Sequence, residues 1–132
     1  MAAIAAGGAL GAVARHGVGV ALPNSPGEWP WSTLLANVSG CLLIGVLVVL
    51  ADAWVTHRLL RPFLGVGVLG GYTTFSAFAV ETIDLAGAGR PALALAYVTV
   101  TAVAALVAVR LGIGLTRVLV ARPGKPAGRP TA

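Results

Sequence analysis

Four long apolar runs constrain this chain more than any other feature. They cover about residues 2–22, 32–54, 62–86 and 92–116, and each is close to the roughly 20 residues that a membrane-spanning helix needs. Charged residues make up only 10% of the 132 positions, whereas a soluble domain carries about 25%. The sequence therefore predicts an all-α membrane protein with four transmembrane helices.

Both ends of the chain are predicted to lie on one side of the membrane, together with the linker between the second and third helices. The opposite side holds Arg90 alone, with Glu28 nearby. The positive-inside rule then places both termini in the cytoplasm of a cell whose plasma membrane the chain spans. Because the basic residues cap helix ends or lie in the tail, they do not indicate nucleic-acid binding. The six on the cytoplasmic side are Arg58, Arg61, Arg117, Arg122, Lys125 and Arg129.

The chain is predicted to form one four-helix unit, residues 1–118, followed by a tail. Residues 119–132 are rich in proline, glycine and basic residues, so a disordered cytoplasmic tail is expected. The first apolar run is expected to be a helix of the mature protein and not a signal peptide, because it lacks a basic n-region and Arg15 followed by glycines fits no cleavage pattern. The single Cys41 excludes a disulfide within the chain and is expected to pack as a small apolar residue.

A polar, glycine-rich stretch, GGYTTFSAF at residues 70–78, lies in the middle of the third apolar run. Backbone that leaves helical geometry at bilayer depth must be buried in protein or line a polar cavity. A helix broken there offers free carbonyls where its first half ends and free N–H groups where its second half begins, which suits an ion site. The stretch therefore predicts a third helix broken at mid-membrane and an ion-handling function.

Aromatic and polar side chains near the predicted break are candidates for an anion path. Phe75 and Phe78 share one helix face beside Ser76, and aromatic ring edges carry partial positive charge. Asn37 on the second helix offers amide N–H groups that can replace water around an anion. Hydrogen bonding between helices explains this asparagine equally well.

Several further polar residues lie within the apolar runs. Arg15 either snorkels toward the interface or attracts anions into a vestibule, and the second interpretation is favoured. His16 beside it is expected to be a plain interfacial residue. Tyr97 and Thr101 lie one turn apart on the fourth helix and can extend a polar track, whereas Glu81 is expected to form hydrogen bonds within the subunit.

Two glycine pairs have the GxxxG spacing: Gly7 with Gly11, and Gly67 with Gly71. Small residues at this spacing permit close helix approach within or between subunits. An oligomer is expected, because a lone unit of this size would expose its polar midpoints to lipid.

Three segments together resemble the fluoride channel family known as Fluc or CrcB. They are GALGAVAR at 8–15, TLLANVSG at 33–40 and GGYTTFSAF at 70–78, of which the third is the most specific. The resemblance covers nearly all of the chain before the tail. It implies an antiparallel, dual-topology-type dimer with two narrow fluoride pores and a structural sodium ion on the two-fold axis.

The resemblance also implies roles for individual residues. The sodium ligands would be the backbone carbonyls of Gly70 and Thr73 from each subunit, and Arg15 would lie in the vestibule. The family's usual pattern is not kept everywhere, since Ala77 replaces a threonine, His16 an aromatic residue and Ser32 a glycine. The fluoride pore would be lined by Asn37, Phe75, Ser76, Phe78, Tyr97 and Thr101.

The expected function is fluoride-selective, passive export that protects the cell from fluoride toxicity. The antiparallel dimer forms either with a second copy of the chain or with an oppositely oriented paralog. The uneven distribution of basic residues predicts one fixed orientation, and on that ground we hypothesise the paralog. Two alternatives stay open: a small multidrug-type cation exporter, which needs an embedded carboxylate in the first helix, and a non-transporting assembly subunit. The sequence contains no metal-site, nucleophile-elbow or nucleotide-loop signature, so an enzyme is not expected.

Overall fold

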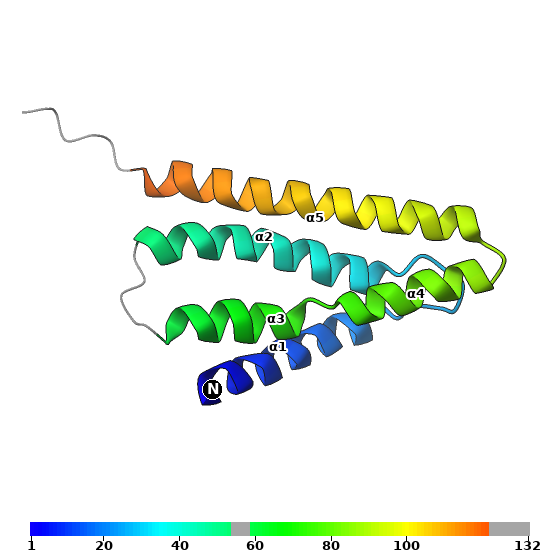
Figure 1. The fold of residues 1–132 in the computed structure, drawn as a ribbon, viewed down its shortest axis with the longest axis horizontal. Coiled ribbons are helices and arrows are strands. Elements are labelled where there is room, and N and C mark those ends of the chain that lie inside the picture. Colours follow the sequence, from blue (N-terminus) through cyan, green and yellow to red (C-terminus); the bar gives the residue numbers. More distant parts are fainter. Residues whose placement is uncertain (54–58, 122–132) are drawn as a thin grey trace, which may run out of the picture.

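The computed structural model describes residues 1–53 and 59–121, which form a bundle of helices (Figure 1). The third long helical stretch of the bundle consists of three consecutive elements, and each of the other three stretches is a single helix. In chain order the elements are α1 (Ala2–Ala21), α2 (Trp31–Ala53), η1 (Pro62–Leu69), α3 (Gly70–Tyr72), α4 (Phe75–Gly87) and α5 (Pro91–Val120).

Four stretches of the described residues are helical and apolar enough to cross a membrane, which confirms the four predicted spans. The final helix continues to Val120, past the predicted end at residue 116, and the predicted end of the second run at residue 54 lies outside the described residues. Pro62 and Pro91 stand at the first positions of η1 and α5, where proline's missing N–H is not needed. The spans are Ala2–Ala21, Trp31–Asp52, Pro62–Gly87 and Pro91–Val120.

Glycines allow α1 to pack directly against η1 and α3, its neighbours in Figure 1. A Cβ atom at Gly7 would lie 2.5 Å from the Phe63 carbonyl oxygen, and one at Gly11 would overlap the Val68 carbonyl oxygen. A Cβ at Gly71 would likewise meet the backbone of α1. Both GxxxG pairs therefore pack against each other within the subunit, where only small residues permit such close approach.

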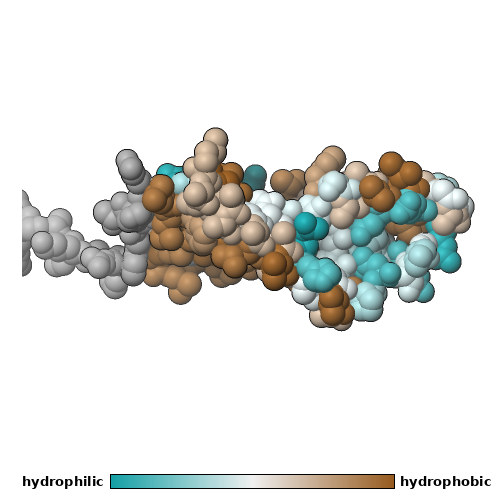
Figure 2. Space-filling view, turned by 90° about the horizontal axis from the view of Figure 1, so that it is seen from below, coloured by the Kyte–Doolittle hydropathy of each residue, from teal (hydrophilic) through white to brown (hydrophobic). Residues whose placement is uncertain are grey.

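A small buried cluster lies at the end of the bundle where α4 meets α5. It is built on Leu85, Ala94 and Tyr97, and Trp29 and Phe78 pack against it. Elsewhere many large apolar side chains are exposed, as expected for helices that face lipid. Seen from below, one end of the molecule is hydrophobic and the end with α4 and the 23–30 linker gathers hydrophilic residues (Figure 2).

Candidate functional site

The third span is interrupted at two threonines, which confirms the predicted break. Thr73 and Thr74 are extended, with ψ of 154° and 121°. Thr73 ends the first half, because its N–H and its hydroxyl both donate to the Leu69 carbonyl, at 3.0 and 2.9 Å. Thr74 begins the second half as the N-cap of α4, its hydroxyl oxygen accepting the Ala77 N–H at 3.2 Å.

Asn37 on α2 holds the backbone of the break with both ends of its amide. Its Oδ1 accepts the Thr74 N–H at 2.8 Å, and its Nδ2 donates to the Thr74 carbonyl at 2.9 Å. The backbone groups of Thr74 would otherwise lack helical partners, and leaving such groups unpaired in a membrane is costly. An amide nitrogen carries two hydrogens, so one Asn37 N–H stays available for another acceptor.

Arg15 on α1 also reaches the break. Its Nε donates to the Gly71 carbonyl at 3.2 Å, close to the C-terminal end of α3, where the helix dipole is negative. The guanidinium is partly buried and lines a polar hollow of about 190 Å³. The hollow's lining is Arg15, His16, Gly19, Ser32, Thr33, Thr74 and Ala77.

Some backbone groups at the break keep no partner within the subunit. Among the described residues, no hydrogen bond reaches the carbonyl oxygens of Gly70 or Thr73, and the N–H groups of Phe75 and Ser76 find no acceptor. Carbonyl oxygens are hard ligands of the kind that bind alkali and alkaline-earth cations. Gly70 and Thr73 are the two residues whose carbonyls the family resemblance implies as sodium ligands, and these oxygens have no partner among the described residues.

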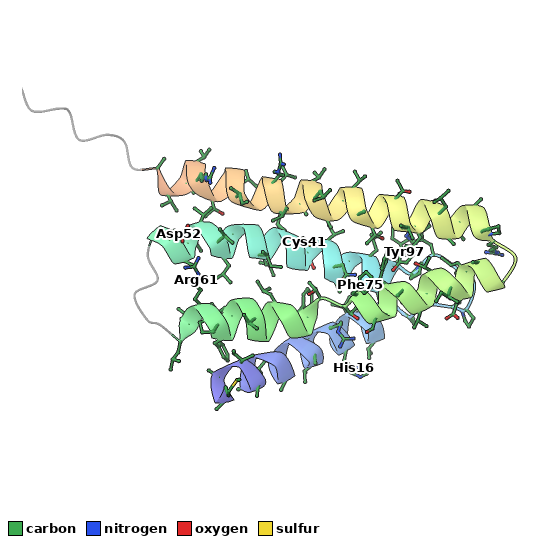
Figure 3. All side chains as sticks on the ribbon, viewed as in Figure 1. His16, Cys41, Asp52, Arg61, Phe75 and Tyr97 are labelled. Atoms are coloured by element: carbon green, nitrogen blue, oxygen red, sulfur yellow. The ribbon has the colours of Figure 1, made fainter. Side chains whose placement is uncertain are left out.

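A groove beside the break brings together most of the predicted pore residues. It has a volume of about 440 Å³ and lies between α2, the break and α5. Figure 3 labels Phe75 and Cys41 in this middle part of the bundle. Apolar side chains of α2 and α5 complete the wall. The predicted residues that line the groove are Asn37, Thr73, Phe75, Phe78 and Thr101.

Thr101 is the polar residue among the α5 residues that line the groove; the others are Val98, Ala102 and Ala105. The residue is 6% exposed, and its hydroxyl has no hydrogen-bond partner among the described residues. Its neighbour Thr99 behaves differently, since its hydroxyl donates to the Leu95 carbonyl of its own helix at 2.9 Å. A buried hydroxyl without a partner costs about 1–3 kcal/mol.

The aromatic residues form a chain that leads away from the groove. Phe75 is 79% exposed, and its ring centroid lies 5.8 Å from that of Phe78. The Phe78 ring lies 5.3 Å from Tyr97, which is fully buried and does not line the groove. Ser76 is exposed, and its hydroxyl lies 3.3 Å from that of Thr74.

Glu81 is the centre of a polar network at the same end of the bundle. Its carboxylate accepts the Tyr97 hydroxyl at 2.8 Å and the Thr33 hydroxyl at 2.7 Å. Asn24 of the first linker also donates to it at 3.3 Å and bonds Ser32 at 2.7 Å. The expected hydrogen bonding of Glu81 within the subunit is confirmed, but its partners on three other segments depend on the tertiary fold and were not foreseen.

The fold and site define a small helical membrane protein whose third span is interrupted at unpaired backbone groups, beside a groove with a few polar atoms. The chain belongs to the CrcB family, because the model "CrcB-like protein, Camphor Resistance (CrcB)" matches its residues 2–113.

Several curated relatives support this assignment. The chain is 52% identical over 116 residues to the fluoride-specific ion channel FluC 2 of Nocardia farcinica, covering 87% of this chain and 83% of that one. It is 50% identical over 123 residues to FluC 2 of Thermobifida fusca, with 92% and 91% covered. The fluoride-specific ion channel FluC of Nitrobacter winogradskyi is 45% identical over 119 residues, with 89% and 94% covered. The predicted resemblance is confirmed. This is a family of channels and not of enzymes.

Proposed function

We propose that this chain is a subunit of a fluoride-selective channel that lowers cytoplasmic fluoride by passive export. The groove carries the proposal, since it places Asn37, Phe75, Phe78 and Thr101 around one space beside the helix break. Fluoride is small and strongly hydrated, so a narrow path must supply donors that replace its water. The second Asn37 N–H, the Thr101 hydroxyl and the edges of the phenyl rings are such groups.

The remaining predicted residues fit positions next to this groove. Ser76 is exposed and lies at the start of α4, where the helix dipole is positive. Tyr97 lies beyond Phe78 and is tied to Glu81. Arg15, at the break and in its polar hollow, supplies a fixed positive charge that favours anions over cations in the vestibule.

The functional unit in this proposal is an antiparallel dimer with one structural sodium ion. The carbonyls of Gly70 and Thr73 have no hydrogen-bond partner in the part of the chain that the structure describes, and two chains would supply four such oxygens. When bound, the ion would neutralise the negative ends of two broken helices and join the subunits. Asn37 and Arg15 contribute by occupying the neighbouring backbone groups, which leaves these two carbonyls for the cation.

The orientation of the chain bears on its partner. We infer that both termini are cytoplasmic in the plasma membrane, because six basic residues lie on that side against Arg90 on the other. Within the described part of the chain, Arg61 pairs with the exposed Asp52 at 3.3 Å, and Arg90 donates to the Gly27 carbonyl at 2.8 Å. A fixed orientation requires an oppositely oriented paralog as the second subunit.

A fluoride-sensitive bacterial strain that lacks its own fluoride exporter provides the test. Expression of this chain, with an oppositely oriented paralog where the chain alone is silent, is expected to restore growth at fluoride concentrations that stop the parent strain. Chloride at the same concentration serves as the control. Membrane-inserted chain that gives no protection in either combination would contradict the proposed function.

A further inference from the structure

Arg110 is an exposed charge on the part of α5 that packs along the membrane-spanning helix α2. A Cβ atom at Gly45 of α2 would meet the Val109 carbonyl oxygen, and one at Gly112 would meet the Leu42 carbonyl oxygen. Arg110 therefore lies level with Gly45, eight residues before the last residue of α2, which is about 12 Å along the helix axis. An arginine at this depth is costly unless an anion pairs with it.

No acidic side chain of the chain itself is in place to pair with Arg110. The chain has four acidic residues, and Asp52 already pairs with Arg61 at 3.3 Å. The other three lie around a hollow at the far end of the bundle: Glu28, Glu81 and Asp84. Among the described residues, no hydrogen bond or ion pair involves the guanidinium of Arg110, or that of Arg117 in the last turn of α5. Both arginines are exposed, so their anion must come from outside the subunit.

The surface between the two arginines fits a phospholipid. Arg110, Gly114 and Arg117 are spaced at i, i+4 and i+7, so they share one face of α5. A Cβ atom at Gly114 would meet nothing within 4 Å, so the surface between the two guanidinium groups is open. On the other side of Arg110 the same face continues with the exposed Leu106 and Val107. Guanidinium groups bind phosphate oxygens through paired N–H donors, and aliphatic side chains suit an acyl chain.

We propose that Arg110 and Arg117 form a binding site for one anionic phospholipid, whose phosphate lies over Gly114. The phosphate supplies the negative charge that the chain's own carboxylates do not. A free phosphate ion would leave the aliphatic side chains of Leu106 and Val107 unused, whereas a lipid covers them. A partner subunit fits this face less well, because contacts between membrane helices are enriched in small residues. The site does not depend on which ion the protein conducts.

Lipid binding by the full chain in detergent tests the site, because orientation in a membrane then plays no part. The chain is titrated with phosphatidylglycerol or with phosphatidylcholine of the same acyl chains, and bound lipids are counted by native mass spectrometry. An arginine close to anionic head groups is worth about fivefold in affinity. The first phosphatidylglycerol is therefore expected to bind at least about fivefold more tightly than phosphatidylcholine.

Two variants and one control locate the preference. Arg110→Gln removes the deeper charge, and Gly114→Leu fills the open surface without changing any charge, so each is expected to remove most of the preference. Arg61→Gln is the matched control, because it removes one charge near the end of α2 from an arginine that already has a carboxylate partner. We expect it to change the preference by less than about twofold. Elution like the natural chain in size-exclusion chromatography checks that each variant is folded.

Four outcomes would overturn the lipid site. The natural chain might bind both lipids equally, or Arg61→Gln might lose as much preference as Arg110→Gln, which would indicate diffuse attraction to net charge. Inorganic phosphate that displaces bound phosphatidylglycerol would indicate a site for a free anion. Dissociation of an oligomer by Arg110→Gln, with the lipid preference retained, would place Arg110 at a contact between subunits. Loss of the preference in folded Gly114→Leu would support the site, since all charges are kept.

Discussion

At the scale of single residues, Asn37 has two tasks. Its amide bonds both the N–H and the carbonyl of Thr74, and its remaining hydrogen is available in the groove. The sequence predicted hydrogen bonding between helices and anion binding as alternatives. The geometry makes them compatible, because an amide has more hydrogen-bonding capacity than either task uses.

The Asn37→Asp substitution keeps the size of the side chain and removes the amide hydrogens, so it tests hydrogen bonding separately from packing. A carboxylate accepts the Thr74 N–H but cannot donate to the Thr74 carbonyl, and it adds negative charge to an anion path. We expect fluoride efflux to fall by at least about tenfold, which corresponds to about 1.4 kcal/mol in the barrier. Thr99→Val is the control, since the Thr99 hydroxyl donates to the Leu95 carbonyl of its own helix and the residue does not line the groove. An Asn37→Asp rate equal to that of the natural chain would show that the amide hydrogens are dispensable.

The Tyr97 hydroxyl offers a test of the Glu81 network. Tyr97→Phe keeps the ring contacts with Trp29 and Phe78 and removes the donor to the Glu81 carboxylate. Hydrogen bonds to charged groups contribute about 1.5–3 kcal/mol, so a lower midpoint of thermal unfolding in detergent is expected. Thr99→Val is the comparison, because the exposed Thr99 hydroxyl donates only to the Leu95 carbonyl of its own helix. Equal midpoints for the two variants would mean that the network adds nothing to stability.

At the scale of elements, the broken helix combines local and distant contributions. The GGYTTFSAF motif predicted the break, and the two threonines indeed terminate one half and cap the other. The π-helical geometry of η1 had no sequence signal. The contacts from Arg15 and Asn37 depend on how α1 and α2 lie beside the break. The local sequence therefore made the interruption predictable. The contacts from Arg15 and Asn37 that support it could not be predicted, because they depend on the three-dimensional arrangement of the helices.

The close packing of α1 on the third span gives an element-scale prediction. Gly11→Ala places a methyl group on the Val68 carbonyl, but Gly8→Ala meets nothing within 4 Å. Overpacking typically costs about 1–3 kcal/mol, so Gly11→Ala is expected to lower the thermal midpoint and the monodisperse fraction in size-exclusion chromatography. Gly8→Ala should behave like the natural chain. If both variants behaved alike, the glycine contact would not hold these helices together.

At the scale of the whole molecule, the four spans could be predicted from the sequence, whereas the partner in the proposed dimer could not. Four spans were predictable because apolar length and the low charged fraction identify membrane helices directly. The dimer partner could not be predicted, because interfaces between membrane subunits use the same small and polar residues as contacts within one subunit. Gly7 and Gly11 illustrate this limit, because their spacing was equally compatible with a dimer contact and they pack inside the subunit.

A topology reporter tests the predicted fixed orientation. A fluorescent protein that matures only in the cytoplasm is fused to the C-terminus, and a periplasmic reporter is fused in a parallel strain. The excess of basic residues on one side predicts signal from the cytoplasmic reporter alone. Replacing Arg61 and Arg117 by alanine should shift part of the population outward. Equal signals from both reporters on the natural chain would instead indicate a dual-topology homodimer.

Fluoride release from liposomes is the most direct test of the central claim. The purified chain, alone and together with an oppositely oriented paralog, is reconstituted, and external fluoride is followed with an ion-selective electrode beside a chloride control. We expect fast fluoride release with no matching chloride release in at least one of these preparations. Silence from folded protein in both preparations, or equal release of chloride, would contradict it.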